Sequence, residues 1–140
     1  MSAAGLEVFD QTLQKTNIWL KAVMEDLGPD RQRAYHALRA VLHSLRDRLT
    51  VEEAAHLSAQ LPLLVRGIYF EGWHPAGKPS KDRSTEEFLA HVEERLQGVE
   101  PINPATATRA VLRVLQANVT DSEMAHVRQM TGKALQPLWP

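Results

Sequence analysis

Two copies of the pattern Glu-x-x-His give this chain its most chemically suggestive residues. Glu53 and His56 form the first copy, and Glu123 and His126 form the second. Residues three apart lie on one face of a helix, so each glutamate can act together with its histidine. Carboxylate and imidazole ligands suit iron, manganese or zinc. One hypothesis is therefore a metal-dependent enzyme.

A di-iron carboxylate bundle needs a glutamate from each of two further helices. Glu25 and Glu94 occupy equivalent places in two other predicted helices and complete that ligand set. The same pattern thus predicts, under this hypothesis, a di-iron or manganese site of the carboxylate type.

Two arguments favour a simpler interpretation. Thr50 with Glu53, and Thr120 with Glu123, match the capping box in which the glutamate reaches back to the helix start. At 100° per residue, His56 also falls away from the apolar stripe of its own helix. We therefore predict cap glutamates and surface histidines, with no metal, no cofactor and no catalytic residue. The chain also lacks nucleophile-elbow, phosphate-loop and His-Glu-x-x-His motifs.

The elements that carry these residues belong to an internal repeat. Residues 39–60 align with residues 109–130 at an offset of 70, and nine of the 22 positions are identical. Chance would give roughly one or two identities at ordinary compositions. Residues 16–27 match residues 85–96 in the same way, with five identities. The sequence predicts one helical domain over 1–140, with repeat one at about 6–70, a linker at 71–84 and repeat two at about 85–140.

Each repeat reads as three main helices, and no segment shows strand alternation. The first repeat has apolar spacing over about 6–27 and 31–48, followed by a third helix that begins after Thr50. Pro62 ends that helix and opens a short one over 62–69, while Gly132 occupies the matching place in the second repeat. The predicted fold class is an all-α, compact bundle of six to eight helices made of two pseudo-symmetric repeats.

The pattern resembles a bacterial family of domains of unknown function, numbered 2267. The residues that carry the resemblance are Arg39-Ala-Val-Leu42, Leu49-Thr50-x-x-Glu53-Ala54, Gln60-Leu61-Pro62, Arg66-Gly67-x-Tyr69-Phe70-Glu71-Gly72-Trp73 and Glu87-Phe88-Leu89. The resemblance covers nearly the whole chain. It implies a helical bacterial domain without an assigned activity, and it supplies no catalytic residues.

A second group of residues predicts an interaction surface. Aromatic and cationic side chains gather at the end of the first repeat, and together with Arg39 they are Arg66, Tyr69, Trp73 and His74. Such groups can bind a peptide or ligand, although aromatics of a linker more often cover the core. The leading functional hypothesis is a non-enzymatic protein-interaction or regulatory module that binds a protein partner or itself.

Charge and hydropathy argue against other classes. The 16 basic and 17 acidic residues give a net charge of −1, so no global attraction to nucleic acid is expected. Residues 49–57 resemble the support helix of a helix-turn-helix, but the apolar stretch 58–65 with Pro62 replaces a recognition helix. The second helix is expected to place its arginines on a solvated or salt-bridged face, and His36 and His43 on a solvated one; the arginines are Arg31, Arg33, Arg39, Arg46 and Arg48. Weak nucleic-acid binding through this helix is a second alternative function. Without an apolar run near 20 residues or a signal peptide, a cytoplasmic protein outside the membrane is expected.

Overall fold

Seven α-helices and a final 3-10 turn make up the computed structural model, which describes residues 5–99 and 101–140. The helices are α1 (Glu7–Leu27), α2 (Arg31–Asp47), α3 (Val51–Ser58), α4 (Leu63–Phe70), α5 (Thr85–Arg95), α6 (Pro104–Asn118) and α7 (Asp121–Leu135), followed by the turn η1 (Gln136–Leu138). No strand occurs within the described residues. The predicted all-α class and the number of helices are confirmed.

Side chains at the helix starts explain where several of these elements begin. Asp30 accepts hydrogen bonds from the first-turn N–H groups of α2, and Asn103 does the same for α6, where Pro104 follows at the first helical position. Thr50, Thr120 and Ser84 cap α3, α7 and α5. Each cap satisfies backbone donors that a helix leaves open, so local sequence sets these boundaries.

Backbone breaks occur where the sequence predicts them. Gly28 ends α1 with a φ of 99°, a value that favours glycine. Pro62 is the N-cap of α4, so this helix starts one residue later than predicted. Gly132 interrupts α7 with φ 55° and ψ −140°, at the place that corresponds to Pro62.

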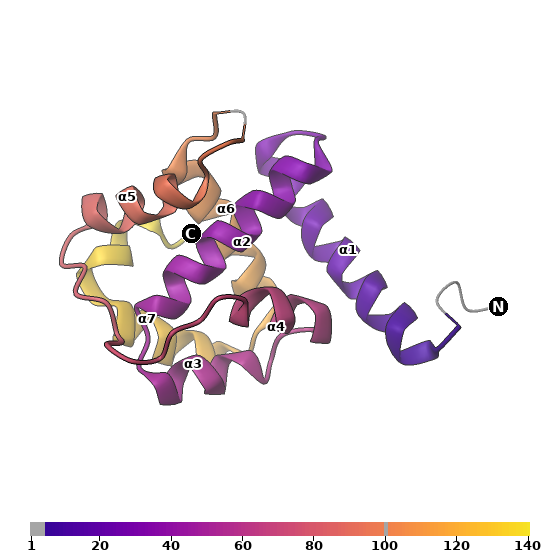
Figure 1. Cartoon of the computed structure of the whole chain (residues 1–140), viewed down its shortest axis with the longest axis horizontal. Helices are drawn as coiled ribbons and strands as arrows, with labels where there is room; N and C mark the ends of the chain where they lie inside the picture. The colour runs from indigo at the N-terminus through magenta and orange to yellow at the C-terminus, as the bar shows by residue number, and fades with distance from the viewer. Residues whose placement is uncertain (1–4, 100) are drawn as a thin grey trace.

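Helix α2 lies at the centre of the molecule. It contacts α1, α4, α5 and α6, and Figure 1 shows it crossing the middle of the bundle. The apolar stripe predicted for it is fully buried: Ala34, Ala37, Leu38, Val41, Leu42, Leu45 and Leu49. One cluster of buried hydrophobic residues includes side chains from all seven helices. These helices therefore share one core.

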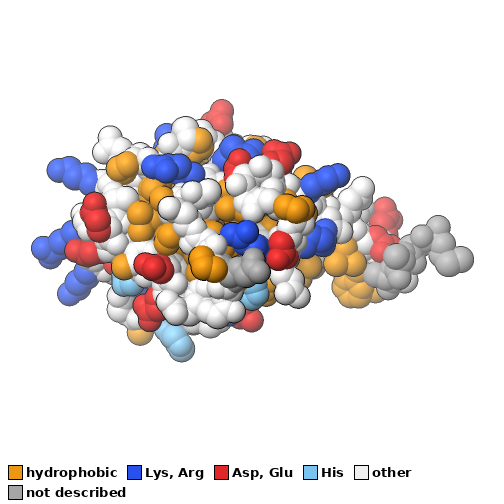
Figure 2. Space-filling model, turned by 90° about the horizontal axis from the view of Figure 1, so that it is seen from above, with side chains coloured by type: hydrophobic (Ala, Val, Ile, Leu, Met, Phe, Trp, Pro, Cys, Tyr) orange, Lys and Arg blue, Asp and Glu red, His pale blue; other side chains and the backbone are white. Residues whose placement is uncertain are grey.

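The first half of α1 extends away from that core. Figure 1 shows its N-terminal end as the part of the chain farthest from the bundle. Leu6, Phe9, Leu13 and Ile18 are 44–56% exposed, so the apolar spacing predicted over about 6–27 does not give one buried face along the whole helix. In Figure 2, hydrophobic side chains gather at this protruding end, whereas charges of both signs intermingle over the rest of the visible face. Among the described residues, no helix is long and apolar enough to cross a membrane.

Candidate metal site

The two Glu-x-x-His patterns meet in space. Glu53, His56, Glu123 and His126 each offer one ligand atom, and these four atoms all lie within 4.8 Å of one another. The residues come from α3 and α7, which pack against each other. Judged from the sequence, a metal site in the core would need its ligands on the apolar stripe, and His56 lies away from that stripe. The structure instead brings them together where the two helices meet, with Glu123 buried and both histidines exposed.

Capping and helix direction together produce this convergence. The hydroxyl oxygen of Thr50 accepts a hydrogen bond from the N–H of Glu53, and that of Thr120 accepts one from the N–H of Glu123. Each glutamate is thereby held in the first turn of its helix. Each histidine follows one turn later on the same face.

The antiparallel packing of α3 and α7 then places each pattern against the other. His56 contacts Glu123, whereas Gln60, further along the chain, contacts Thr120 at the start of α7. The Gln60 side-chain amide donates to the Thr120 hydroxyl at 3.0 Å and accepts from the Thr120 N–H at 2.8 Å. These two bonds fix the register between the helices.

The capping boxes predicted from the sequence form only in part. The threonine hydroxyls accept as expected, but among the described residues neither glutamate carboxylate returns to the N–H of its threonine. In α7 the amide of Gln60 already accepts from the Thr120 N–H. The prediction that Glu53 and Glu123 serve as reciprocal caps is therefore wrong, because a residue from the neighbouring helix region takes the bond and leaves the carboxylate of Glu123 free to turn inward.

Glu123 is the buried centre of the cluster. Its side chain is 1% exposed, and its Oε1 lies 2.7 Å from Nδ1 of His56 and 3.7 Å from Nδ1 of His126. The histidine side chains are 60% and 61% exposed, as predicted for surface histidines. Two imidazole nitrogens thus point at one carboxylate oxygen.

The two carboxyl groups lie beside each other, close enough for a hydrogen bond between them when one is protonated, and each has one buried oxygen. These oxygens are Oε2 of Glu123 and Oε1 of Glu53, which accept no other hydrogen bond within the described residues. Burial raises the pKa of Glu53, and the neighbouring Glu123 carboxylate raises it further, against the opposite effect of His56 and His126. Two carboxylates at this separation resist ionising together unless a cation lies between them.

The cluster opens to a cleft, so an ion could enter from solvent. Glu53, His56 and His126 line this cleft, whose volume is ≈ 590 Å³, together with Glu52 and Met130. Two carboxylates and two imidazoles supply the donors that zinc, iron or manganese use. The arrangement can therefore coordinate one divalent ion with an open side toward the cleft.

The two further glutamates of the di-iron hypothesis lie elsewhere. Glu25 is exposed and pairs with Arg113 of α6 at 3.7 Å. Glu94 lines a different cleft, beside Asp47 and Arg95. Neither belongs to the cluster, so the donor set suits a single ion and not a pair.

The predicted interaction residues do not form one surface. Tyr69 is buried and donates its hydroxyl to the carbonyl of Ala54, and Trp73 is half-buried against the core. Arg66 donates to the carbonyls of Ser58 and Leu61 at the end of α3. Arg39 pairs with Glu71 at 2.7 Å, and His74 lies in the same cleft as that pair. The aromatic side chains therefore cover the core, which was the alternative to an interaction surface.

A buried polar network surrounds Asp47, and the sequence did not predict it. Arg46 is 3% exposed and donates from Nε to Asp47, and His43 is buried with Nε2 donating to the carbonyl of Ile68 at 2.7 Å. The solvated position predicted for His43 is wrong because the second half of α2 is covered on nearly every side, whereas Arg46 forms an ion pair, as the salt-bridged alternative predicts. The only signal in the sequence was the high density of arginine on one helix.

The fold and the site together define the class of this protein. It is all-helical, and two helices that are distant in the sequence bring two carboxylates and two imidazoles together. The chain belongs to the family described as "Uncharacterized conserved protein (DUF2267)", whose family model matches residues 16–138. A comparison with curated proteins finds no match. The family description names no activity, and the matched range includes all four residues of the cluster.

Proposed function

We propose that this protein is a metal-binding helical module that holds one divalent transition-metal ion between α3 and α7. The ligands are Glu53, His56, Glu123 and His126. The observation that carries the proposal is the convergence of these four side chains around the buried carboxylate of Glu123.

Electrostatics supports a cation at this position. A buried carboxylate oxygen without a hydrogen bond destabilises a fold by roughly 1–3 kcal/mol. A divalent ion would neutralise both carboxylates and coordinate their buried oxygens. Ligand atoms around a tetrahedral ion with bonds of about 2.0–2.2 Å lie roughly 3.4 Å apart, so the four ligand atoms, now within 4.8 Å of one another, would move to that spacing when an ion binds.

The ion would cross-link α3 to α7, and the fraction of cross-linked protein would depend on the concentration of available metal. Its ligands come in pairs from helices separated by more than 60 residues, and binding would fasten the short α3 to α7. This fits the regulatory or interaction module predicted from the sequence. The four arginines of α2 and Arg48, which follows it, do not favour nucleic-acid binding, because each of the five already contacts a group of this chain.

Titration of metal-stripped protein with Zn²⁺, Mn²⁺ and Co²⁺ tests the proposal. We expect saturation at about one ion per chain, a rise in Tm, and the strong visible absorption of four-coordinate Co²⁺. At a free metal concentration 100 times Kd, the gain in unfolding free energy is about 2.7 kcal/mol.

Histidine variants provide the comparison. We expect His56→Ala and His126→Ala to weaken binding by more than about 100-fold, since losing even a hydrogen-bond partner of a metal ligand typically costs 10–100-fold. His36→Ala is the matched control, because this histidine lies on α2 and stacks beside Tyr35. Equal metal affinity in all three variants, or no saturable binding to the natural chain, would overturn the proposal.

A further inference from the structure

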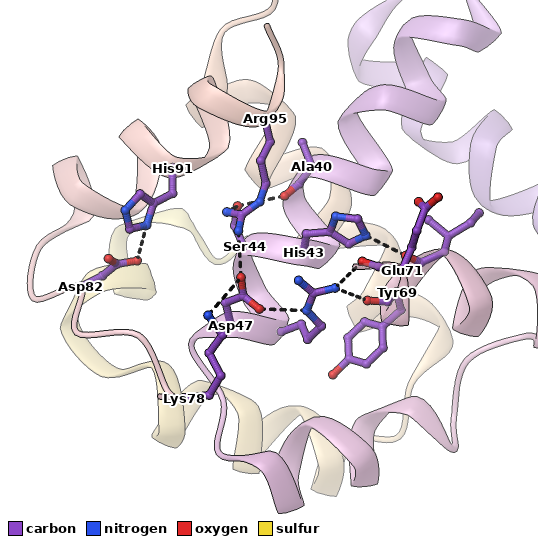
Figure 3. Close-up of polar contacts among 12 residues, drawn as sticks. Ala40, His43, Ser44, Asp47, Tyr69, Glu71, Lys78, Asp82, His91 and Arg95 are labelled. Carbon is purple, nitrogen blue, oxygen red and sulfur yellow. Dashed lines mark hydrogen bonds and ion pairs between the residues drawn. The ribbon is translucent and has the colours of Figure 1, made fainter. Parts of the chain in front are cut away.

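A second cleft, lined mainly by charged side chains, lies between α2, the segment 71–84 and α5. Its volume is ≈ 400 Å³, within the range of roughly 300–1,000 Å³ found for small-molecule sites. Arg39, Arg46, Lys78 and Arg95 are its cations, and Asp47 and Glu71 are its acids. Figure 3 shows Lys78 and Arg95 reaching Asp47 from different elements.

The acids do not balance the cations. Asp47 alone serves three of them: Arg46 at 2.9 Å, Arg95 at 2.8 Å and Lys78 at 3.8 Å. Glu71 serves only Arg39. Four positive and two negative side chains leave a formal excess of two positive charges in the cleft, before any contribution from His43 or His74, which also line it.

One of these cations is buried and retains an unused donor. The Nε of Arg46 donates to Asp47, and its Nη1 donates to the backbone carbonyls of Tyr69 and Glu71 at 2.9 Å each. Its Nη2 has no partner in the part of the chain that the structure describes. Arg46 lines the cleft, and the bonds of its Nε and Nη1 fix its guanidinium group there.

The same positive charges act on the pKa of the neighbouring histidine, His43. Burial lowers the pKa of His43, and the charges of Arg46, Arg39 and Arg95 lower it further, although its bond to the carbonyl of Ile68 acts in the opposite direction. His43 therefore stays neutral near pH 7 and adds no charge. Arg39, Arg46 and Arg95 come from two different helices, α2 and α5, so the potential belongs to the cleft and not to one helix.

We propose that this cleft binds a small phosphate-bearing ligand, with the phosphate group placed against Arg46 and within reach of Arg39, Lys78 and Arg95. Guanidinium groups present planar pairs of donors that match phosphate oxygens. The volume of the cleft and its excess of cations over acids suit a small anion. A nucleic-acid backbone would require an open row of cations.

Calorimetric titration at constant ionic strength tests this site. Inorganic phosphate and glycerol 3-phosphate are the two probes, glycerol is the uncharged control, and EDTA removes metal so that phosphate cannot act through the Glu53 cluster. We expect one saturable binding event per chain for the phosphate probes and none for glycerol. Tighter binding of glycerol 3-phosphate than of phosphate identifies a monoester as the ligand, whereas the reverse order identifies free phosphate.

Substitutions distinguish phosphate binding in this cleft from a general effect of the protein's charge on phosphate binding. Arg39→Gln and Lys78→Gln are partly exposed positions that the fold tolerates, and each should weaken phosphate binding about tenfold, as expected for losing one charge-assisted contact. Lys81→Gln removes an exposed charge of the same segment outside the cleft and should change nothing. His126→Ala should also leave phosphate binding unchanged, which distinguishes this site from the metal site. No saturable heat, or equal effects of Lys78→Gln and Lys81→Gln, would show that the cluster only ties the helices together.

Discussion

The side chain of the third residue of a helix can cap that helix or contact groups on another one, as Glu53 and Glu123 show. In a capping box its carboxylate returns to the helix start. Here the threonine hydroxyls alone hold the helix starts, and the carboxylates turn toward each other and toward the histidines. The matched arrangement at Ser84 and Glu87 differs, because the Glu87 carboxylate accepts from the N–H of Arg83 and has no opposing helix.

Glu53→Gln should make the metal-free protein more stable and abolish its response to metal. The amide removes a carboxyl group whose ionisation is opposed by burial and by Glu123. We expect a gain in unfolding free energy on the order of 1 kcal/mol without metal, comparable to correcting one unfavourable buried polar group. Denaturant unfolding at pH 7, with EDTA and then with Zn²⁺, measures both effects.

Glu87→Gln is the matched control for this experiment. It makes the same change at the same position of a capped helix, on an exposed surface. It should alter neither the stability nor the response to Zn²⁺ by more than about 0.5 kcal/mol, as is usual for surface substitutions. Destabilisation of the metal-free Glu53→Gln variant would show that this carboxylate is a structural acceptor and not a ligand.

At the scale of elements, α3 depends on α7. A helix of eight residues has little stability of its own in water. Ala54 and Leu57 bury its inner face, and Arg66 donates to the carbonyl of Ser58 at its C-terminal end. Gln60, just beyond that end, bonds to Thr120 of the neighbouring helix region. The position of Glu53 and His56 is therefore decided by what α3 packs against.

Gln60→Ala tests that dependence. The substitution removes two hydrogen bonds to Thr120, each worth roughly 0.5–1.5 kcal/mol. We expect a loss of about 1–3 kcal/mol of unfolding free energy and a weaker affinity for Zn²⁺, because the two pairs of ligands lose their register. Thermal unfolding and metal titration measure the two effects.

Gln129→Ala provides the comparison, since Gln129 is exposed on α7 away from Thr120. It should leave both quantities unchanged. If Gln60→Ala lowers stability but leaves the Zn²⁺ affinity of the folded protein intact, the register argument is wrong.

At the scale of the molecule, the distribution of burial along the first two helices is uneven. Every residue from Ala40 to Asp47 of α2 is buried, including polar ones. The outer half of α1 projects from the bundle (Figure 1) and contacts α4 at Thr12, while its apolar residues remain accessible. Equivalent leucines should therefore differ greatly in their contribution to stability.

Leu42→Ala and Leu13→Ala make that contrast measurable. Leu42 is fully buried in the central helix, so its truncation should cost about 2–5 kcal/mol of unfolding free energy. Leu13 is 44% exposed, and its truncation should cost less than about 1 kcal/mol. Denaturant unfolding of both variants under the same conditions tests the prediction, and similar losses would mean that the outer half of α1 is covered in solution.

Much of the fold could be read from local signals. The caps at Thr50 and Thr120, the break at Pro62 and the stripe of α2 depend on residues a few positions apart. Physical effects of this kind act within one turn of a helix, so the sequence alone predicts them. The internal repeat also remains a prediction from sequence, and it points to α3 and α7 as equivalents.

The doubled Glu-x-x-His was likewise visible in the sequence, but its meaning was decided only by tertiary structure. The sequence determined that each glutamate and histidine share a helix face. Whether the two faces meet depends on the antiparallel packing of α3 and α7 and on Gln60, which lies 60 residues from Thr120. The burial of Arg46 and His43 was decided in the same way, because helical periodicity describes one buried face and cannot report that neighbours cover a central helix on nearly every side.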